Sequence, residues 1–210
     1  YWANDSIAIA EGLEKAGIRF NFSGMSNLSS FDGPAVFISN HMSTLETMVL
    51  PCLIQPKKEV TFIVKKELID YPFFGAILNS RDPIAVGRNN PREDLMLVIE
   101  QGIDKLKNGR SIIVFPQKTR KSKIDEESFN TLGIKLAKKT NSYVVPLALA
   151  TDAWGNGKFI KEIGKLDSSK IVNISFGTPF KVETNGNEEH KRVIQFIKNE
   201  LLSWGRADCV

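Results

Sequence analysis

The sequence predicts an α/β protein of one domain, in which a mixed, mostly parallel sheet carries helices on both faces. Three observations support this prediction. Short apolar runs alternate along the chain with longer stretches that repeat apolar residues at helical spacing. Several of the apolar runs are nearly continuous, as in strands that are buried on both faces. At 210 residues, with no internal repeat or low-complexity tract, the chain has the length of a single domain.

The first part of the chain supplies a helix, a strand and a long connection. Residues 5–16 place apolar side chains on one helical face, and Gly17 ends that helix. Residues 18–22 alternate apolar and polar side chains, which predicts a half-buried strand. A turn-rich connection, residues 24–34, leads to the apolar run 35–38, which predicts a buried strand.

The middle of the chain repeats the alternation of strand and helix. Asn90 suits the N-cap of a helix, with Pro91 at its first position and Glu93 at its third, and this helix should reach Asn108. The very apolar run 111–115 then predicts a strand near the centre of the sheet. Other elements of this part are expected as a helix at 44–54 and strands at 60–64 and 84–86.

Two segments of this part allow two interpretations each. The run 73–78 is apolar on nearly every face, so it predicts either a buried helix or the lining of a pocket for an alkyl chain. The charged stretch 121–128 is either a solvated loop or, because it follows a central strand, a lid over a site at the end of that strand.

The last part of the chain closes the domain. A helix is expected at 130–140, and a strand follows at 143–150, where Pro146 indicates an edge strand or a bulge. His190 falls in the first turn of the last helix and should face solvent. We expect a loop-rich stretch at 151–170, a strand at 171–176 and a helix at 188–204. The domain would then consist of an N-terminal helix at 1–17, a core at 18–180 and a closing helix at 186–205.

Composition restricts the class of partner more than it identifies one. Lys and Arg number 28 against 24 Asp and Glu, and a net charge of +4 suits an anionic partner without requiring one. No basic stripe with interleaved aromatic residues is present, so a nucleic-acid partner is not predicted. Cys52 and Cys209 lie too far apart in sequence to indicate a disulfide framework or a metal site, which favours a reducing compartment.

The sequence contains no run of eighteen apolar residues, so it predicts no transmembrane helix. The first residue is Tyr1. We therefore expect the natural start to lie further upstream, where an anchor or a targeting segment has room.

His41 is the strongest candidate for a catalytic residue. It follows the buried run 35–38 and precedes a helix, so it should lie on a surface loop at a strand-to-helix corner. In open α/β sheets, the crevice at the carboxyl ends of the strands is where ligands bind. Because an imidazole can take up a proton near neutral pH, His41 is placed to act as a general base.

Glu46 has two possible roles at this corner. Within one helix, five steps of about 100° would place His41 and Glu46 on different faces. If His41 lies instead in the loop, the carboxylate of Glu46 can accept its Nδ1 proton and leave Nε2 free as the base. Alternatively, Ser43 is an N-cap and Glu46 completes a capping box, which accounts for Glu46 without any catalytic role.

Several stretches, in this order, resemble the glycerolipid acyltransferase family, which includes bacterial 1-acylglycerol-3-phosphate acyltransferases. Residues 40–46, Asn-His-Met-Ser-Thr-Leu-Glu, resemble its first motif, a His followed after four residues by an acid. Residues 115–120, Phe-Pro-Gln-Lys-Thr-Arg, resemble the third motif, usually Phe-Pro-Glu-Gly-Thr-Arg, and residues 144–149 resemble the fourth. The segments 65–75 and 86–88 match the middle of the family pattern.

The resemblance implies an O-acyltransferase in which His41 and Glu46 form the general-base dyad. His41 would deprotonate a hydroxyl of a lysophospholipid or glycerol-phosphate-type acceptor. That hydroxyl then attacks the thioester of an acyl-CoA or acyl carrier protein, which serves as co-substrate, and no cofactor is implied. No Gly-x-Ser-x-Gly elbow occurs, in agreement with a reaction without an acyl-enzyme. The substrate- and phosphate-binding residues carried over are Lys65, Arg88, Gln117, Lys118, Thr119 and Arg120.

A single Lys or Arg is usually a solvated surface charge. Lys65, Arg88 and Arg120 are candidates for phosphate binding because they lie at strand ends. The chain also departs from the family pattern: Glu46 replaces the usual Asp, and Gln117-Lys118 replaces Glu-Gly. The second change moves the local charge toward the cation by about two units, so we expect a more anionic acceptor or donor than usual.

Two other functions are alternatives to acyl transfer. A non-catalytic lipid- or membrane-binding domain of the same fold is favoured by Gln117-Lys118 and opposed by the intact His41 with its acid. A metal-assisted hydrolase is opposed because the chain has only two histidines, which is too few for a His-rich metal site.

For the acyltransferase, we expect peripheral attachment to the cytoplasmic face of a membrane, because the acceptor is a lipid and the chain is basic.

Overall fold

The computed structural model describes residues 2–70, 74–87, 89–117, 119–157 and 164–210. Its strands are β1 (Arg19–Ser23), β2 (Ala35–Ser39), β3 (Val60–Lys65), β4 (Ile84–Val86), β5 (Ser111–Val114), β6 (Tyr143–Ala150) and β7 (Ile171–Phe176). Its helices are α1 (Trp2–Lys15), α2 (Leu45–Ile54), α3 (Lys66–Ile69), α4 (Phe74–Asn79), α5 (Pro91–Lys107), α6 (Leu132–Thr140) and α7 (Asn187–Ser203), with 3₁₀ turns at Met25–Ser29 and Ala207–Cys209.

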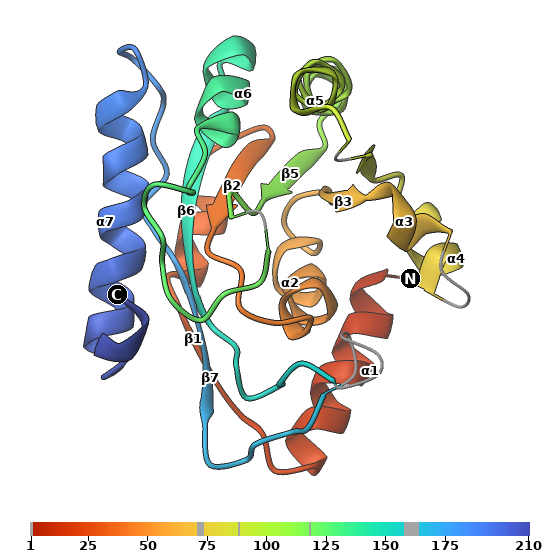
Figure 1. The fold of residues 1–210 in the computed structure, drawn as a ribbon, viewed down its shortest axis with the longest axis vertical. Helices are drawn as coiled ribbons and strands as arrows, with labels where there is room; N and C mark the ends of the chain where they lie inside the picture. The colour runs from red at the N-terminus through yellow and green to blue at the C-terminus, as the bar shows by residue number, and fades with distance from the viewer. Residues whose placement is uncertain (1, 71–73, 88, 118, 158–163) are drawn as a thin grey trace.

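The described strands form one seven-stranded sheet in the order β1-β7-β6-β2-β5-β3-β4. Neighbouring strands are parallel throughout, except for the antiparallel pair of β6 and β7. Helices α5, α6 and α7 lie on one side of the sheet and α1 and α2 on the other, as Figure 1 shows. The predicted mixed, mostly parallel α/β fold is therefore confirmed.

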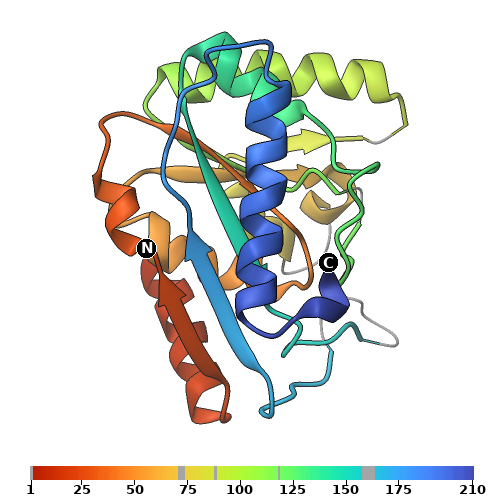
Figure 2. The same ribbon diagram turned by 90° about the vertical axis from the view of Figure 1, so that its left-hand side faces the viewer.

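Two hydrophobic cores hold the layers together, one on each face of the sheet. In β2, Val36 and Ile38 contribute to the core beneath α5, α6 and α7, whereas Ala35 and Phe37 contribute to the core beneath α1 and α2. Successive side chains of a strand point to opposite faces, so a strand covered on both sides must be apolar throughout. In Figure 2, α7 lies across the front of the sheet and covers the first of these cores.

Local sequence signals place several helix ends as expected. Oδ1 of Asn90 accepts the N–H groups of Arg92 at 3.1 Å and Glu93 at 3.5 Å, and its Nδ2 donates to Oε1 of Glu93 at 2.7 Å. Gly17 follows α1 with φ +90°, a left-handed conformation that glycine adopts without steric cost. Both predicted boundaries are confirmed to within a residue or two.

The expectation that Pro146 marks an edge strand or a bulge is wrong in its first part, because β6 lies between β7 and β2. Pro146 pairs with Ile38 of β2, and β7 pairs with β6 only from Leu147 onward. Beyond that gap, Val144 and Phe180 exchange two backbone hydrogen bonds of 2.8 and 3.0 Å. Gly177 still donates its N–H to the carbonyl of Pro146 at 2.8 Å, but regular pairing with β7 is interrupted here, so the missing N–H of Pro146 falls at a break in the ladder.

The prediction that His190 faces solvent is also wrong. Its side chain is half-buried, and its ring lies 5.8 Å from the ring of Phe129. Burial lowers the pKa of His190, because the charged imidazolium loses solvation. The helical phase of α7 did not reveal this contact, because Phe129 belongs to the segment before α6.

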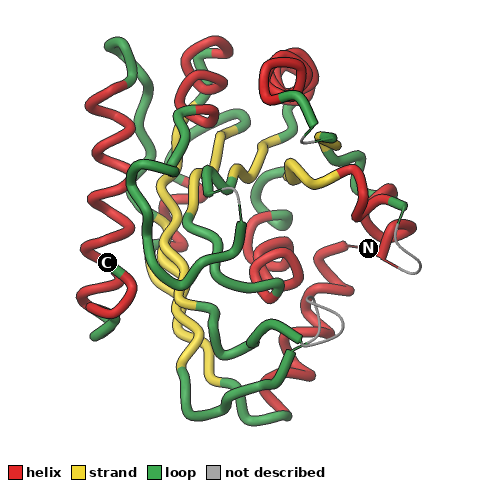
Figure 3. The backbone as a smooth tube through the Cα atoms, viewed as in Figure 1, coloured by secondary structure: helices red, strands yellow, loops and turns green. Residues whose placement is uncertain are grey.

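The connections after β2, β5 and β6 meet at one edge of the sheet, and Figure 3 shows them as neighbouring loops. The N–H of Lys121, after β5, donates to the carbonyl of His41, after β2, at 2.8 Å. The N–H of Ile124 donates to the carbonyl of Cys209 at 2.9 Å, and Ile124 is buried. The stretch 121–128 is therefore anchored at two points.

None of the helices in the described part of the chain has the length and apolar character of a membrane-spanning helix.

Candidate active site

His41 and Glu46 contact each other at the corner between β2 and α2. Nδ1 of His41 lies 2.5 Å from Oε2 of Glu46. The side chain of Glu46 is fully buried, and that of His41 is 18% exposed. The His41 ring also stacks on Phe115, with 4.3 Å between the ring centroids. His41 is thus less exposed than a residue on a surface loop was expected to be, because the strand end of β5 lies against it.

The two oxygens of Glu46 make different contacts, one with the backbone before α2 and one with His41. Oε1 accepts the N–H of Ser43 at 2.8 Å, which is one of the two bonds of a capping box, whereas Oγ of Ser43 accepts the N–H of Leu45 at 3.2 Å and not that of Glu46. Oε2 is directed to His41. The helix begins one residue later than expected, at Leu45 with Thr44 as its N-cap. The capping interaction and the histidine contact therefore do not exclude each other.

The hydrogen bonds around Glu46 fix the tautomer of His41. Oε1 accepts three hydrogen bonds, from the N–H of Met42 at 2.6 Å, from the N–H of Ser43 and from Oγ1 of Thr151 at 2.6 Å. A carboxylate surrounded by donors is anionic and accepts only, so Nδ1 of His41 must carry the proton. Nε2 then holds a lone pair, and it forms no hydrogen bond with any described residue. Such an imidazole can act as a general base.

Gln117 supports His41 through the backbone. Its side chain is 2% exposed; Oε1 accepts the N–H of His41 at 3.1 Å, and Nε2 donates to the carbonyl of Lys123 at 3.2 Å. The amide thus joins the histidine loop to the stretch 121–128. A carboxylate at this position would accept the first hydrogen bond but could not donate the second.

Next to His41 lies a cavity of about 410 Å³, within the usual size of a ligand pocket. Its walls are largely apolar, with Phe62, Val114 and Phe115 among them. Among the described residues that line it, the cationic side chains are Lys65 and Arg120, and no carboxylate lines it. Such a lining suits an apolar chain joined to an anionic group.

Arg120 is held in place by polar groups on two sides. Its Nη1 donates to Oγ1 of Thr44 at 2.6 Å and to Oδ1 of Asn156 at 3.4 Å. Lys65 ends β3, and Thr119 is exposed at the same cavity. The structure therefore brings Lys65, Gln117, Thr119 and Arg120 together beside His41.

Arg88 and Lys118, which the sequence also proposed as binding residues, lie outside the described residues. In the part of the chain that is described, no group of three or more His, Cys, Asp or Glu side chains is arranged to hold a metal ion.

The sequence reasoning missed two residues that shape this site. Asn40 is buried, and its side-chain amide exchanges hydrogen bonds of 2.8 and 2.9 Å with the backbone of Leu149, which joins the ends of β2 and β6. Thr151, the first residue after β6, donates to Glu46. Both are polar residues that directly follow a buried strand, and that position at the carboxyl edge of the sheet was the available signal.

Comparisons with known proteins bear on the family to which this chain belongs. A family model described as Acyltransferase matches residues 19–150. A protein of Pseudomonas aeruginosa named 1-acyl-sn-glycerol-3-phosphate acyltransferase is 35% identical over 133 residues, which cover 63% of this chain and 50% of that protein. A chloroplastic protein of Arabidopsis thaliana with the same activity in its name is 32% identical over 142 residues, covering 68% of this chain and 38% of that protein.

Among solved structures, the 1-acyl-sn-glycerophosphate acyltransferase of Thermotoga maritima superposes with a TM-score of 0.73 at 20% identity. The match covers 96% of this chain and 77% of that structure, and it supports the fold. The matched regions span half or less of the two relatives named above. Because the family model covers more than half of the residues, including the His41–Glu46 corner, the chain belongs to the acyltransferase family.

Proposed function

We propose that this protein is an O-acyltransferase that moves a fatty acyl group from an acyl thioester to a hydroxyl of a lysophospholipid or glycerol-phosphate-type acceptor. The observation that carries the proposal is the His41–Glu46 pair at the mouth of a cavity with apolar walls and cationic side chains. Relatives named 1-acyl-sn-glycerol-3-phosphate acyltransferase support this class of reaction.

In the proposed mechanism, Nε2 of His41 takes the proton of the acceptor hydroxyl. The oxygen attacks the thioester carbonyl, and the bond to sulfur breaks as the tetrahedral intermediate collapses. The departing thiolate takes the proton back from His41, so that free thiol and the new ester are formed. Glu46 keeps the ring in the Nδ1–H tautomer and stabilises the imidazolium that forms during attack. The thioester is a co-substrate, acyl-CoA or acyl carrier protein, and no cofactor takes part.

The cavity supplies the groups that such substrates need. Lys65 and Arg120 are placed to pair with phosphate, and a guanidinium can bind it through two parallel N–H donors. The family resemblance also assigns phosphate binding to Arg88 and Lys118, which lie outside the described residues. The apolar wall suits the acyl chain. Gln117 and Thr119 complete the polar side of the cavity.

The acceptor should carry more negative charge than that of a relative with Glu-Gly in the third motif. Gln117 removes an anion from the cavity wall, and Lys118 adds a cation to the sequence. Restoring the family pattern with Gln117→Glu and Lys118→Gly should shift preference toward less anionic acceptors. An unchanged ranking of neutral, singly phosphorylated and more anionic lysolipids would contradict this part of the proposal.

We further propose that the protein attaches peripherally to the cytoplasmic face of a membrane. A lipid acceptor is reached at a membrane surface, and each Lys or Arg near an anionic surface contributes about 1 kcal/mol. The protein should therefore sediment with anionic liposomes at low salt and less with neutral ones. Equal recovery in the supernatant with both would count against attachment through this chain.

The decisive experiment measures the free thiol that is released from long-chain acyl-CoA, or from acylated carrier protein, when a panel of lysolipids is offered as acceptors. Acceptor-dependent release that disappears in His41→Ala supports the proposal. The second candidate, a non-catalytic lipid-binding domain, is favoured by the departure of Gln117-Lys118 from the family motif. It predicts liposome binding without thiol release from either donor, and that result would overturn the acyltransferase proposal.

A further inference from the structure

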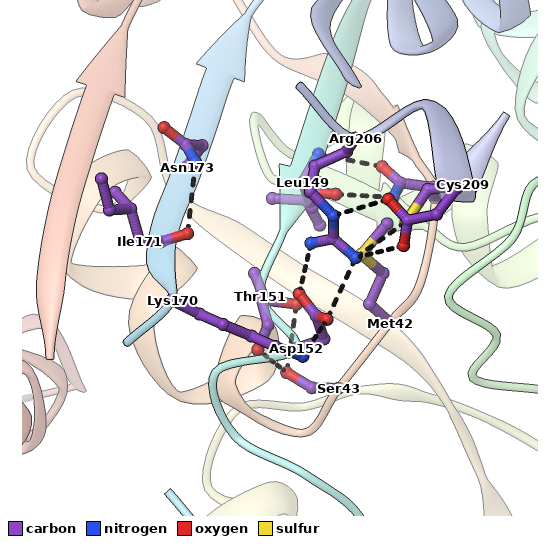
Figure 4. A network of polar contacts seen from close by, with 12 residues as sticks. Met42, Ser43, Leu149, Thr151, Asp152, Lys170, Ile171, Asn173, Arg206 and Cys209 are labelled. Carbon is purple, nitrogen blue, oxygen red and sulfur yellow. Dashed lines mark hydrogen bonds and ion pairs between the residues drawn. The ribbon is translucent and has the colours of Figure 1, made fainter. Parts of the chain in front are cut away.

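The hydroxyl of Thr151 contacts the catalytic carboxylate from a distant part of the chain. Thr151 directly follows β6, and its side chain is fully buried. Its Oγ1 lies 2.6 Å from Oε1 of Glu46, to which it donates. Oγ of Ser43 donates to the carbonyl of Thr151 at 2.9 Å and lies 3.1 Å from its hydroxyl. Figure 4 shows Ser43 and Thr151 side by side in this network.

The other two donors to Oε1 differ from Thr151 in an important way. The N–H groups of Met42 and Ser43 belong to the same loop as His41, so they move with that loop. They hold Glu46 relative to its own corner only. Thr151 belongs to another strand end, and its hydroxyl fixes the carboxylate relative to the sheet.

The corner that carries Thr151 is itself firmly held. Asp152 accepts two hydrogen bonds from Arg206, at 2.7 and 3.1 Å, and one from Lys170 at 2.7 Å (Figure 4). The carbonyl of Ala153 accepts the N–H of Asp167 at 2.8 Å. Burial raises the pKa of Asp152, but the hydrogen bonds from Arg206 and Lys170 outweigh it and keep that pKa below its usual value. Asp152 is therefore charged at neutral pH, and the corner stays anchored.

We propose that Thr151 is a positioning residue, which holds the carboxylate of Glu46 in the orientation that His41 requires. The inference deepens the proposed acyl transfer and rests on it for its kinetic consequence. Without the hydroxyl, Oε1 keeps two donors and the carboxylate gains freedom to turn away from the imidazole. Small misplacements of a catalytic group cost large factors in rate. Where the carboxylate still faces the ring, it has lost one donor to its charged form and stabilises the imidazolium more, so the His41–Glu46 pair binds a proton more readily.

Replacing Thr151 leaves the other charged groups near His41 and Glu46 unchanged. Lys65 and Arg120 share the cavity with His41, and Lys121 contributes its backbone N–H to the His41 carbonyl. Asp152 is next to Thr151 but is paired with Arg206. Removing the hydroxyl of Thr151 also removes its 3.1 Å contact with Oγ of Ser43, but Ser43 keeps its hydrogen bond to the carbonyl of Thr151, so the main loss is the contact with Glu46.

The test compares Thr151→Val, which keeps the shape and removes the hydroxyl, with Thr151→Ser, which keeps the hydroxyl. Thr61→Val is the matched control, because Thr61 is equally buried and its hydroxyl donates to the carbonyl of Arg81 at 2.9 Å. We expect Thr151→Val to lower kcat about tenfold to a hundredfold with little change in KM. The acid limb of its pH profile should move up by as much as about one pH unit. Thr151→Ser and Thr61→Val should keep kcat within about threefold, consistent with a role specific to the contact with Glu46.

A second readout does not depend on activity. The protein has two histidines, so NMR can follow the ring of His41 during a pH titration, with His190→Gln to assign the signals. We expect Thr151→Val to raise the pH midpoint of the His41 signal and Thr151→Ser to leave it unchanged. If Thr151→Val does not fold, Thr151→Ala replaces it in both measurements. An unmoved midpoint would overturn the inference, whereas absent thiol release by the wild type would overturn the proposed function instead.

Discussion

Replacing the carboxylate of Glu46 by an amide should stop catalysis while leaving the fold in place. In Glu46→Gln, the amide oxygen is needed where three donors converge, namely the N–H groups of Met42 and Ser43 and the hydroxyl of Thr151. The NH₂ group must then face Nδ1 of His41. Because an amide NH₂ only donates, Nδ1 becomes an acceptor and the ring proton moves to Nε2. The atom that should take the substrate proton is then already protonated.

The size of the effect follows from these contacts. The equivalent carboxylate-to-amide change in a Ser-His-Asp triad lowers turnover by about 10⁴, through the same wrong tautomer. We expect a loss of about 10³ to 10⁴ for Glu46→Gln. Three hydrogen bonds also change from charge-assisted to neutral, which lowers stability. The free-energy cost of burying the charge disappears, which offsets part of that loss. The net loss of stability should be about 1 to 3 kcal/mol, or roughly 2 to 10 °C in melting temperature.

The chain offers a matched control in Glu189. It occupies the third position of α7 and accepts the N–H groups of Glu183 and Thr184 at 3.1 Å and the hydroxyl of Thr184 at 2.8 Å. Its surroundings resemble those of Glu46, except that no histidine faces it. Glu189→Gln should therefore lower the melting temperature to a similar extent without lowering turnover.

The assay is acceptor-dependent thiol release, measured beside thermal unfolding for both variants. If Glu46→Gln keeps turnover within tenfold of the wild type, the tautomer argument is refuted. Glu46 would then serve only to cap α2. Equal losses of turnover in both variants would trace the effect to stability instead.

Three further predictions follow from the site and its surroundings. His41→Ala should lower kcat by about 10² to 10⁴, while His190→Ala should not; similar kinetics for the two variants would exclude His41 as the base. Gln117→Glu should destabilise the protein by about 1 to 3 kcal/mol, because a buried carboxylate then faces a carbonyl, and an unchanged melting temperature would contradict this. Burial raises the pKa of Glu189, but hydrogen bonds from Thr184 and the backbone outweigh it and lower that pKa to about 2. The ionised carboxylate of Glu189 stabilises the folded state fully above about pH 4.5, and this stabilisation is lost as the pH falls toward 2. The denaturant midpoints of wild type and Glu189→Gln should therefore converge over that range.

The sequence predicted the elements whose signals are local. Continuous apolar runs marked the strands that two helical layers cover, because both faces of such a strand lose contact with water. Asn90 and Gly17 marked helix ends through the hydrogen bonds and backbone angles that those residue types favour. The apolar run before His41 and the helix start after it also placed the histidine outside the helix, as the structure has it.

Features that depend on distant segments were not predictable in the same way. Pro146 suggested an edge, and only the register of β7 shows why a proline is tolerated inside this sheet. Thr151 is 105 residues from Glu46, and neither residue type announces the contact. Gln117 was interpreted as a change of charge beside the acceptor, which stays a prediction, and its bridge between the backbone of His41 and that of Lys123 was not predictable.

The anchoring of the stretch 121–128 affects how this site can open. Lys121 holds the carbonyl of His41, the amide bridge described above holds the histidine N–H, and Ile124 is tied to Cys209. Local opening of a segment releases together the groups that share its hydrogen bonds. The stretch and the histidine corner therefore form one cooperative unit. Lifting this stretch as a lid would take away the backbone contacts that hold His41, so we expect the proposed substrates to enter from the cavity side.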